Sequence, residues 1–161
     1  MTNIQVNPKA QAGKAFTSKT MFSRKTTVSV NIAADSSIVW ALLTHAPDFP
    51  RWNSTVVSLT GEIKEGGAIE LKSTLDAKRV FKLKVKELIP EKRLVWGDAM
   101  GSRVYTLDKN AGGILFTMSE KIGGPLFPLF AGYIPSFDES FERFAADLKK
   151  EAESIQNSKS L

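Results

Sequence analysis

Three polar residues each extend a run of alternating apolar residues by one step, and they are the side chains best placed to do chemistry. These residues are Arg103, Glu120 and Asp98. The runs that they extend are Tyr105–Leu107, Ile114–Phe116–Met118 and Leu94–Trp96. Because successive side chains of a strand point to opposite faces, all three polar groups should face the apolar side of a sheet. A guanidinium there would suit a carboxylate or enolate oxygen.

Arg103 and Glu120 should meet across a hairpin that turns at DKNAGG, residues 108–113. Pairing Leu107 with Ile114 would set Glu120 diagonally from Arg103 on the same face. A charge buried alone is costly, so the two should form an ion pair or meet solvent. The pair could orient the head group of a ligand, or it could be a plain salt bridge at the rim of the sheet; the sequence leaves both interpretations open.

The sequence lacks the residues and motifs that disulfides, common metal sites and the best-known catalytic sites require. The chain has no cysteine and one histidine, His45, which excludes disulfides, thiolate metal sites and histidine clusters. It also has no HExxH motif, no glycine-rich phosphate loop and no recognisable nucleophile motif. We therefore predict no metal site and no cofactor, and the sequence identifies no catalytic residue.

Composition indicates one ordinary globular domain. The 161 residues are 42% hydrophobic, and no apolar run approaches the ~20 residues that span a bilayer. The net charge of +5 comes from residues 1–34, which hold five basic residues and no acid. We interpret residues 1–23 as a basic flexible leader before a domain at 24–161, in preference to a nucleic-acid arm or an organelle-targeting peptide. No nucleic-acid partner is expected, and a cytoplasmic location is predicted.

Alternation from Lys25 onward predicts a first strand, and SSIVWALLTH and APDFPRWN then predict two short helices. About six more strands follow, separated by short turns that favour antiparallel pairing. A long helix is expected from Pro135 to Gln156, with Phe137, Phe141 and Phe144 on its apolar face. The predicted fold class is α+β: a curved antiparallel sheet of about seven strands gripping a long C-terminal helix.

Three segments resemble one known superfamily. IVWALLTHAPDFPRWN is similar to the opening helix pair of the START-like proteins, the polyketide cyclase/dehydrase and lipid-transport (SRPBCC) type, and GGILFTMSEKIGG resembles their last strand. FERFAADLKKEAE resembles their terminal helix. The resemblance spans residues 25–154 and implies a helix-grip fold. His45 and Ile114 depart from the usual pattern, where an acid or Asn and a turn Thr are common.

This resemblance implies an elongated hydrophobic ligand cavity between sheet and helix. Together with Arg103 and Glu120, the expected ligand-binding residues are Trp52, Leu71, Phe81, Leu83, Trp96, Tyr105, Phe116, Met118, Phe137, Phe141 and Phe144. The alternative is that these side chains simply pack against one another. We favour a binding protein for a small apolar or amphipathic molecule, such as a lipid, acting as a monomer or homodimer. The other hypotheses are a polyketide cyclase/dehydratase-like enzyme and an interaction or toxin-like module.

The apolar segment GGPLFPLFAGYIP, residues 123–135, has neither helical nor strand periodicity. It could be a packed structural segment, a lid over the cavity mouth, or the first turns of the terminal helix kinked at Pro135.

Overall fold

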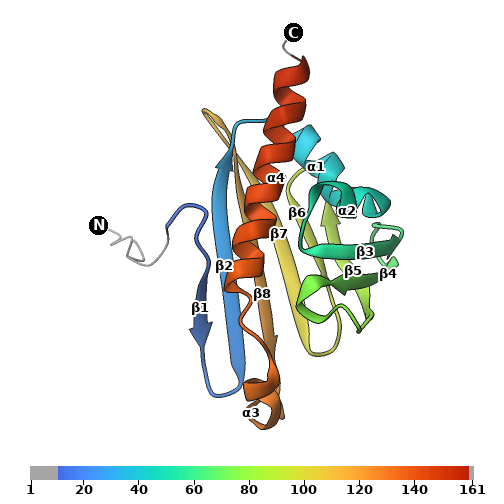
Figure 1. Ribbon diagram of the computed structural model, residues 1–161, viewed down its shortest axis with the longest axis vertical. Helices are drawn as coiled ribbons and strands as arrows, with labels where there is room; N and C mark the ends of the chain where they lie inside the picture. Colours follow the sequence, from blue (N-terminus) through green and yellow to red (C-terminus); the bar gives the residue numbers. More distant parts are fainter. Residues whose placement is uncertain (1–10, 160–161) are drawn as a thin grey trace.

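One antiparallel sheet of eight strands curves around a long C-terminal helix in the computed structural model of the chain, which describes residues 11–159 (Figure 1). The strands are β1 (Phe16–Lys19), β2 (Ser23–Ile32), β3 (Val56–Gly61), β4 (Ala68–Ser73), β5 (Phe81–Ile89), β6 (Arg93–Gly97), β7 (Gly101–Asn110) and β8 (Gly113–Gly123). The helices are α1 (Ser36–Thr44), α2 (Phe49–Trp52), α3 (Phe127–Phe130) and α4 (Asp138–Lys159), with short 3₁₀ turns at Ala46–Asp48, Thr74–Asp76 and Ala131–Tyr133. The helix-grip fold predicted from the sequence is confirmed.

The sheet follows the order β1-β2-β8-β7-β6-β5-β4-β3, so the early strand β2 lies beside the last strand, β8. In β8 the side chains of Ile114, Phe116 and Met118 are buried, whereas the residues between them are partly exposed. The apolar face of the sheet therefore turns toward α4, and the polar face turns outward. The buried face of α4 supplies Phe141, Phe144, Ala145, Leu148 and Ala152.

The helix α4 begins at Asp138, three residues later than the sequence predicts. Ile134 has extended backbone angles, as expected for a residue before proline, so Pro135 ends the preceding segment and does not open the helix. The hydroxyl of Ser136 accepts a hydrogen bond from the Asp138 amide at 3.3 Å, and the Phe137 carbonyl accepts one from Phe141 at 2.8 Å. Phe137 thus belongs to the linker before α4.

Residues Phe16–Lys19 of the expected flexible leader form a strand, β1, that the sequence did not predict. Residues 1–10 of that leader lie outside the described residues. Thr17 hydrogen-bonds both the Thr26 hydroxyl and the Asp138 carboxylate, and the Ala15 amide donates to Glu142 at 3.0 Å. β1 is therefore an edge strand held by polar contacts to β2 and α4, which an apolar-periodicity argument does not detect.

The β7–β8 hairpin has a tighter turn than predicted. Asn110 pairs with Gly113 across a two-residue loop, so Leu107 lies opposite Phe116 and not opposite Ile114. The Asn110 side chain accepts a hydrogen bond from the Gly112 amide at 3.1 Å, and Gly113 has φ of +138°. Among residues 110–113 only Gly113 has a positive φ, a conformation that glycine adopts without steric cost. The shift is two residues, which keeps every side chain on its predicted face.

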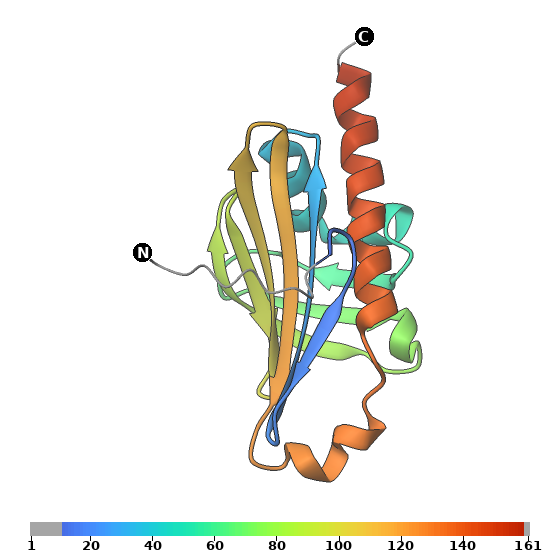
Figure 2. The same ribbon diagram turned by 90° about the vertical axis from the view of Figure 1, so that its left-hand side faces the viewer.

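Residues 125–133 form a short separate helical segment, α3 and the turn Ala131–Tyr133, between β8 and α4. Figure 2 shows this segment at the end of the molecule opposite the C-terminus. Phe127 is buried, whereas Leu126, Leu129 and Tyr133 are exposed. The segment is therefore not the first turns of α4.

Candidate ligand-binding site

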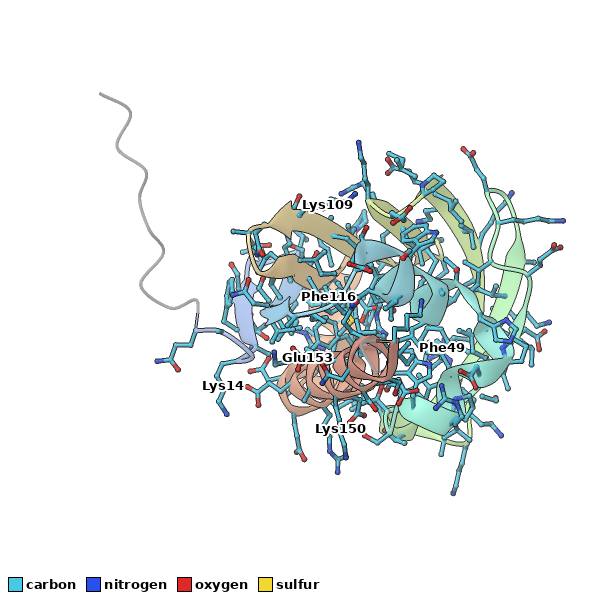
Figure 3. The ribbon with its side chains drawn as sticks, turned by 90° about the horizontal axis from the view of Figure 1, so that it is seen from above. Lys14, Phe49, Lys109, Phe116, Lys150 and Glu153 are labelled. Carbon is cyan, nitrogen blue, oxygen red and sulfur yellow. The ribbon has the colours of Figure 1, made fainter. Side chains whose placement is uncertain are left out.

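Aromatic rings fill the middle of the space between the sheet and α4. Phe144 lies at the centre, with ring centroids of Trp52, Tyr105, Phe49 and Phe116 at 5.9, 5.7, 6.2 and 6.3 Å. Figure 3, a view from above in which α4 is seen nearly end-on, shows Phe49 and Phe116 inside the molecule and Lys109 and Lys150 outside it. These rings come from α2, β7, β8 and α4, so the centre of the interior is an aromatic cluster that four elements share.

Arg103 and Glu120 meet directly across β7 and β8 at one end of this cluster. The guanidinium Nη2 of Arg103 donates to the Glu120 carboxylate at 3.3 Å, and its Cζ lies 5.1 Å from the centre of the Phe141 ring. The side chains of Arg103 and Glu120 are only 13% and 20% exposed. The predicted contact between the two charges is confirmed, although they are opposite neighbours and not diagonal ones.

Two buried polar atoms beside this ion pair, Nε of Arg103 and the hydroxyl of Tyr105, have no hydrogen-bond partner within residues 11–159. Burial alone lowers the pKa of Arg103, but Glu120 and Tyr105 together outweigh it, so the net effect raises the pKa and the guanidinium stays charged. Burial raises the pKa of Tyr105 to about 12, although Arg103 acts in the opposite direction. The Arg103 guanidinium and the Tyr105 hydroxyl also interact with each other, so the site offers one cation and one neutral phenol side by side.

Arg24 is a further charged residue of this end that the sequence interpretation missed. Its side chain lies against the Phe137 ring, with Cζ 4.6 Å from the ring centre, and donates to the carbonyls of Ile134 and Pro135 at 3.2 and 2.8 Å. Burial lowers its pKa, while Glu120 and Asp138 raise it. Arg24 therefore fastens the linker before α4 onto β2. The predicted strand begins at Lys25, whereas β2 begins at Ser23. With the earlier start, Arg24 would share the inner face with Thr26 and Val28, which are both buried.

The remaining predicted residues all lie on the helix side of the sheet, but not all in one place. Trp96, Tyr105, Phe116, Met118, Phe141 and Phe144 are buried in the core. Leu71, Phe81 and Leu83 lie on β4 and β5, at least two strands from β7 in the sheet order. Phe81 is half-buried, and the Arg79 guanidinium covers its ring at 4.5 Å. One end of the interior, which we call the polar end, holds the ion pair of Arg103 and Glu120 beside the rings of Phe137 and Phe141. The residues of β4 and β5 lie apart from this end.

Asp98 does not join this site, so the prediction that it faces the apolar side is wrong. β6 ends at Gly97, and Asp98 is an exposed residue of the β6–β7 turn. Its carboxylate accepts hydrogen bonds from the amides of Met100 and Gly101 at 2.8 and 3.2 Å. Asp98 is the first residue after β6, so it belongs to the turn, and the alternation of the strand no longer decides which face its side chain takes.

Comparison with known proteins agrees with this architecture. The family model described as "Polyketide cyclase / dehydrase and lipid transport" matches residues 23–153. The chain belongs to this family. No curated protein matches the chain, and no described helix has the length and apolarity needed to cross a membrane.

Solved structures share the fold of this member of the family at low sequence identity. A conserved protein of unknown function from Enterococcus faecalis is 15% identical with a TM-score of 0.64, over 88% of this chain and 78% of that one. A Rhodobacter sphaeroides protein is 18% identical with a TM-score of 0.63, over 86% and 97% of the two chains. DynU16, described from the dynemicin biosynthetic locus, is 19% identical with a TM-score of 0.58, over 83% and 49%. These likenesses establish the fold alone.

The last residues of the segment IVWALLTHAPDFPRWN, Trp52 and Asn53, have a structural role in this member. The Trp52 ring centroid lies 4.9 Å from that of Phe49, and Asn53 Oδ1 accepts hydrogen bonds from the amide and hydroxyl of Thr55 at 3.0 and 2.7 Å. Trp52 Nε1 and Asn53 Nδ2 are buried without a hydrogen-bond partner in the described part of the chain. Within residues 11–159, no group of three His, Asp or Glu side chains is arranged to hold a metal ion.

Proposed function

We propose that this chain binds one small amphipathic molecule between the sheet and α4, with the polar head of the ligand at Arg103 and Tyr105. The observation that carries the proposal is the pair of polar atoms without a hydrogen-bond partner, Arg103 Nε and Tyr105 Oη, in a mostly apolar interior. An unsatisfied buried N–H or O–H costs roughly 1–3 kcal/mol, so a fold that retains two side by side benefits from an acceptor there.

An oxygen anion fits these donors better than a neutral group. Arg103 remains charged, and Glu120 occupies only its Nη2 atom. A carboxylate or enolate oxygen could accept from Arg103 Nε and from the Tyr105 hydroxyl together. The apolar tail would then lie along Phe116, Phe141 and Phe144, whose rings would have to separate to admit it.

The alternative function is a cyclase- or dehydratase-like enzyme that uses the same residues. Tyr105 favours it, because a buried phenol with a pKa of about 12 remains protonated and can donate to an oxygen on which negative charge develops. Glu120 would then be the candidate proton acceptor. Binding is required in both cases, so the binding test comes first.

A titration with 1-anilinonaphthalene-8-sulfonate, an apolar fluorescent anion, tests the proposed binding. We expect saturable binding of one dye per folded chain, with displacement by dodecanoate, because both molecules combine an apolar body with an anionic group. Fluorescence that rises without saturation, or that dodecanoate does not reduce, would contradict a defined interior site. Ile89→Ser is a control that should leave the titration unchanged, because the Ile89 side chain is exposed at the end of β5 and away from the interior.

A further inference from the structure

Six of the nine large apolar side chains that are exposed among residues 11–159 lie at one end of the molecule. They are Met21, Phe22, Met100, Leu126, Leu129 and Tyr133, with exposed fractions from 43% to 88%, and we call them the apolar tip. They come from the β1–β2 turn, the β6–β7 turn and the α3 segment. Figures 1 and 2 both show the β1–β2 turn and α3 at the end opposite the C-terminus.

Backbone hydrogen bonds hold the three parts of the apolar tip together. The Gly124 amide donates to the Phe22 carbonyl at 3.0 Å, and the Gly123 amide donates to the Met100 carbonyl at 3.0 Å. Both glycines directly precede the α3 segment. These bonds hold the three segments together, and a group of exposed apolar side chains at one end of a molecule is typical of an interaction surface.

Lysines without acidic partners lie beside the tip. Lys25 and Lys121 are exposed and directly opposite each other on β2 and β8, and Lys19 is exposed at the end of β1. None of the three forms an ion pair within the part of the chain that the structure describes. Like charges placed opposite each other destabilise a sheet, so this arrangement has a cost that an anionic partner would offset.

Two nearby acids bind other groups of the chain and not these lysines. The Asp98 carboxylate is engaged by two backbone amides of its own turn, and Asp138 accepts a hydrogen bond from Thr17. Glu139 is exposed, but it lies on the first turn of α4, where a negative charge suits the helix dipole.

We propose that the apolar tip docks on an anionic lipid bilayer, with Leu126, Leu129 and Phe22 entering the interface and Lys19, Lys25 and Lys121 facing the lipid head groups. Apolar side chains combined with unpaired lysines are what such a surface attracts. Tyr133 adds an exposed ring with a polar end, which suits the head-group level. The exposed lysines beside the apolar side chains favour an anionic bilayer over an apolar protein surface. This inference does not depend on what the interior binds.

Co-sedimentation of the full chain with phosphatidylcholine vesicles, with and without about one third phosphatidylglycerol, tests this docking. We expect the chain to sediment with the anionic vesicles and to be released by raised salt. Lys25→Gln with Lys121→Gln should weaken the partition about five-fold for each lysine. Leu126→Ser with Leu129→Ser should weaken it at least about ten-fold without unfolding the chain, because both leucines are exposed.

The matched controls carry the same changes elsewhere. Val80→Ser with Ile89→Ser and Lys109→Gln with Lys150→Gln alter exposed residues outside the tip and should leave the partition unchanged. Equal losses in tip and control variants, or no sedimentation of the wild type with anionic vesicles, would overturn the proposal. A wild-type dimer in analytical ultracentrifugation that the two leucine changes dissociate, without any vesicle binding, would also overturn it and assign the tip to a protein interface.

Discussion

Phe144→Ala is expected to lower the free energy of unfolding by about 3–5 kcal/mol. Phe144 is 1% exposed, and its ring lies within 6.3 Å of four other aromatic rings, so the substitution removes the centre of the cluster. Neighbours from α2, β7 and β8 cannot all move to fill the space, because each is held by its own element. Urea denaturation followed by tryptophan fluorescence measures the change.

Phe22→Ala is the matched control for Phe144→Ala, because it removes the same ring from a side chain that is 53% exposed. Its effect should stay within about 0.5 kcal/mol. A loss below about 1.5 kcal/mol for Phe144→Ala would mean that the interior relaxes readily and that the aromatic cluster is not the core of the grip.

Arg103→Met should cost about 2–4 kcal/mol of unfolding free energy, because it leaves the Glu120 carboxylate mostly buried without its cation. Adding Glu120→Gln to the same chain should recover a large part of that loss, since the remaining amide needs no counter-charge. Urea denaturation of the two single variants and the double variant forms a complete cycle.

The surface pair Arg93–Glu87 is the control for this cycle, since its Arg Nε–carboxylate distance is 2.9 Å but both side chains are 41% exposed. Arg93→Met should cost less than about 1 kcal/mol. If Arg103→Met and Arg93→Met lowered the free energy of unfolding by similar amounts, Arg103 would behave as a surface charge. That result would contradict its placement in the mostly buried ion pair with Glu120.

Alternation along the chain was enough to predict the fold and the inward faces of Arg103, Tyr105 and Glu120, because the period of a strand decides the face of every side chain. The strand register could not be predicted from alternation, since a shift of two residues keeps the same faces. The predicted cross-strand partner of Leu107, Ile114, is therefore wrong by two residues, and the partner in the structure is Phe116. Local hydrogen bonds at Asn110 and Gly113 decide the register.

Tertiary contacts explain what the sequence did not reveal. β1 is held by hydrogen bonds from Thr17 to Thr26 and to Asp138, which is 121 residues away in the sequence. An alternation of apolar residues does not reveal such polar contacts. Arg24 was missed because a buried arginine at a strand end looks like part of a basic leader until Phe137 and the Pro135 carbonyl are placed against it. Phe49 was missed because two prolines flank it in a segment without periodicity.

A comparison of dodecanoate with dodecanol tests most directly whether Arg103 binds the anionic head of a ligand held between the sheet and α4. Isothermal titration of both molecules into wild type and Arg103→Met, with circular dichroism to confirm folding, gives four affinities. We predict that the substitution weakens dodecanoate by ~1.5–3 kcal/mol, the value of a hydrogen bond to a charged group, and changes dodecanol little. Equal weakening of both molecules, or no saturable binding of either to wild type, would contradict this role of Arg103.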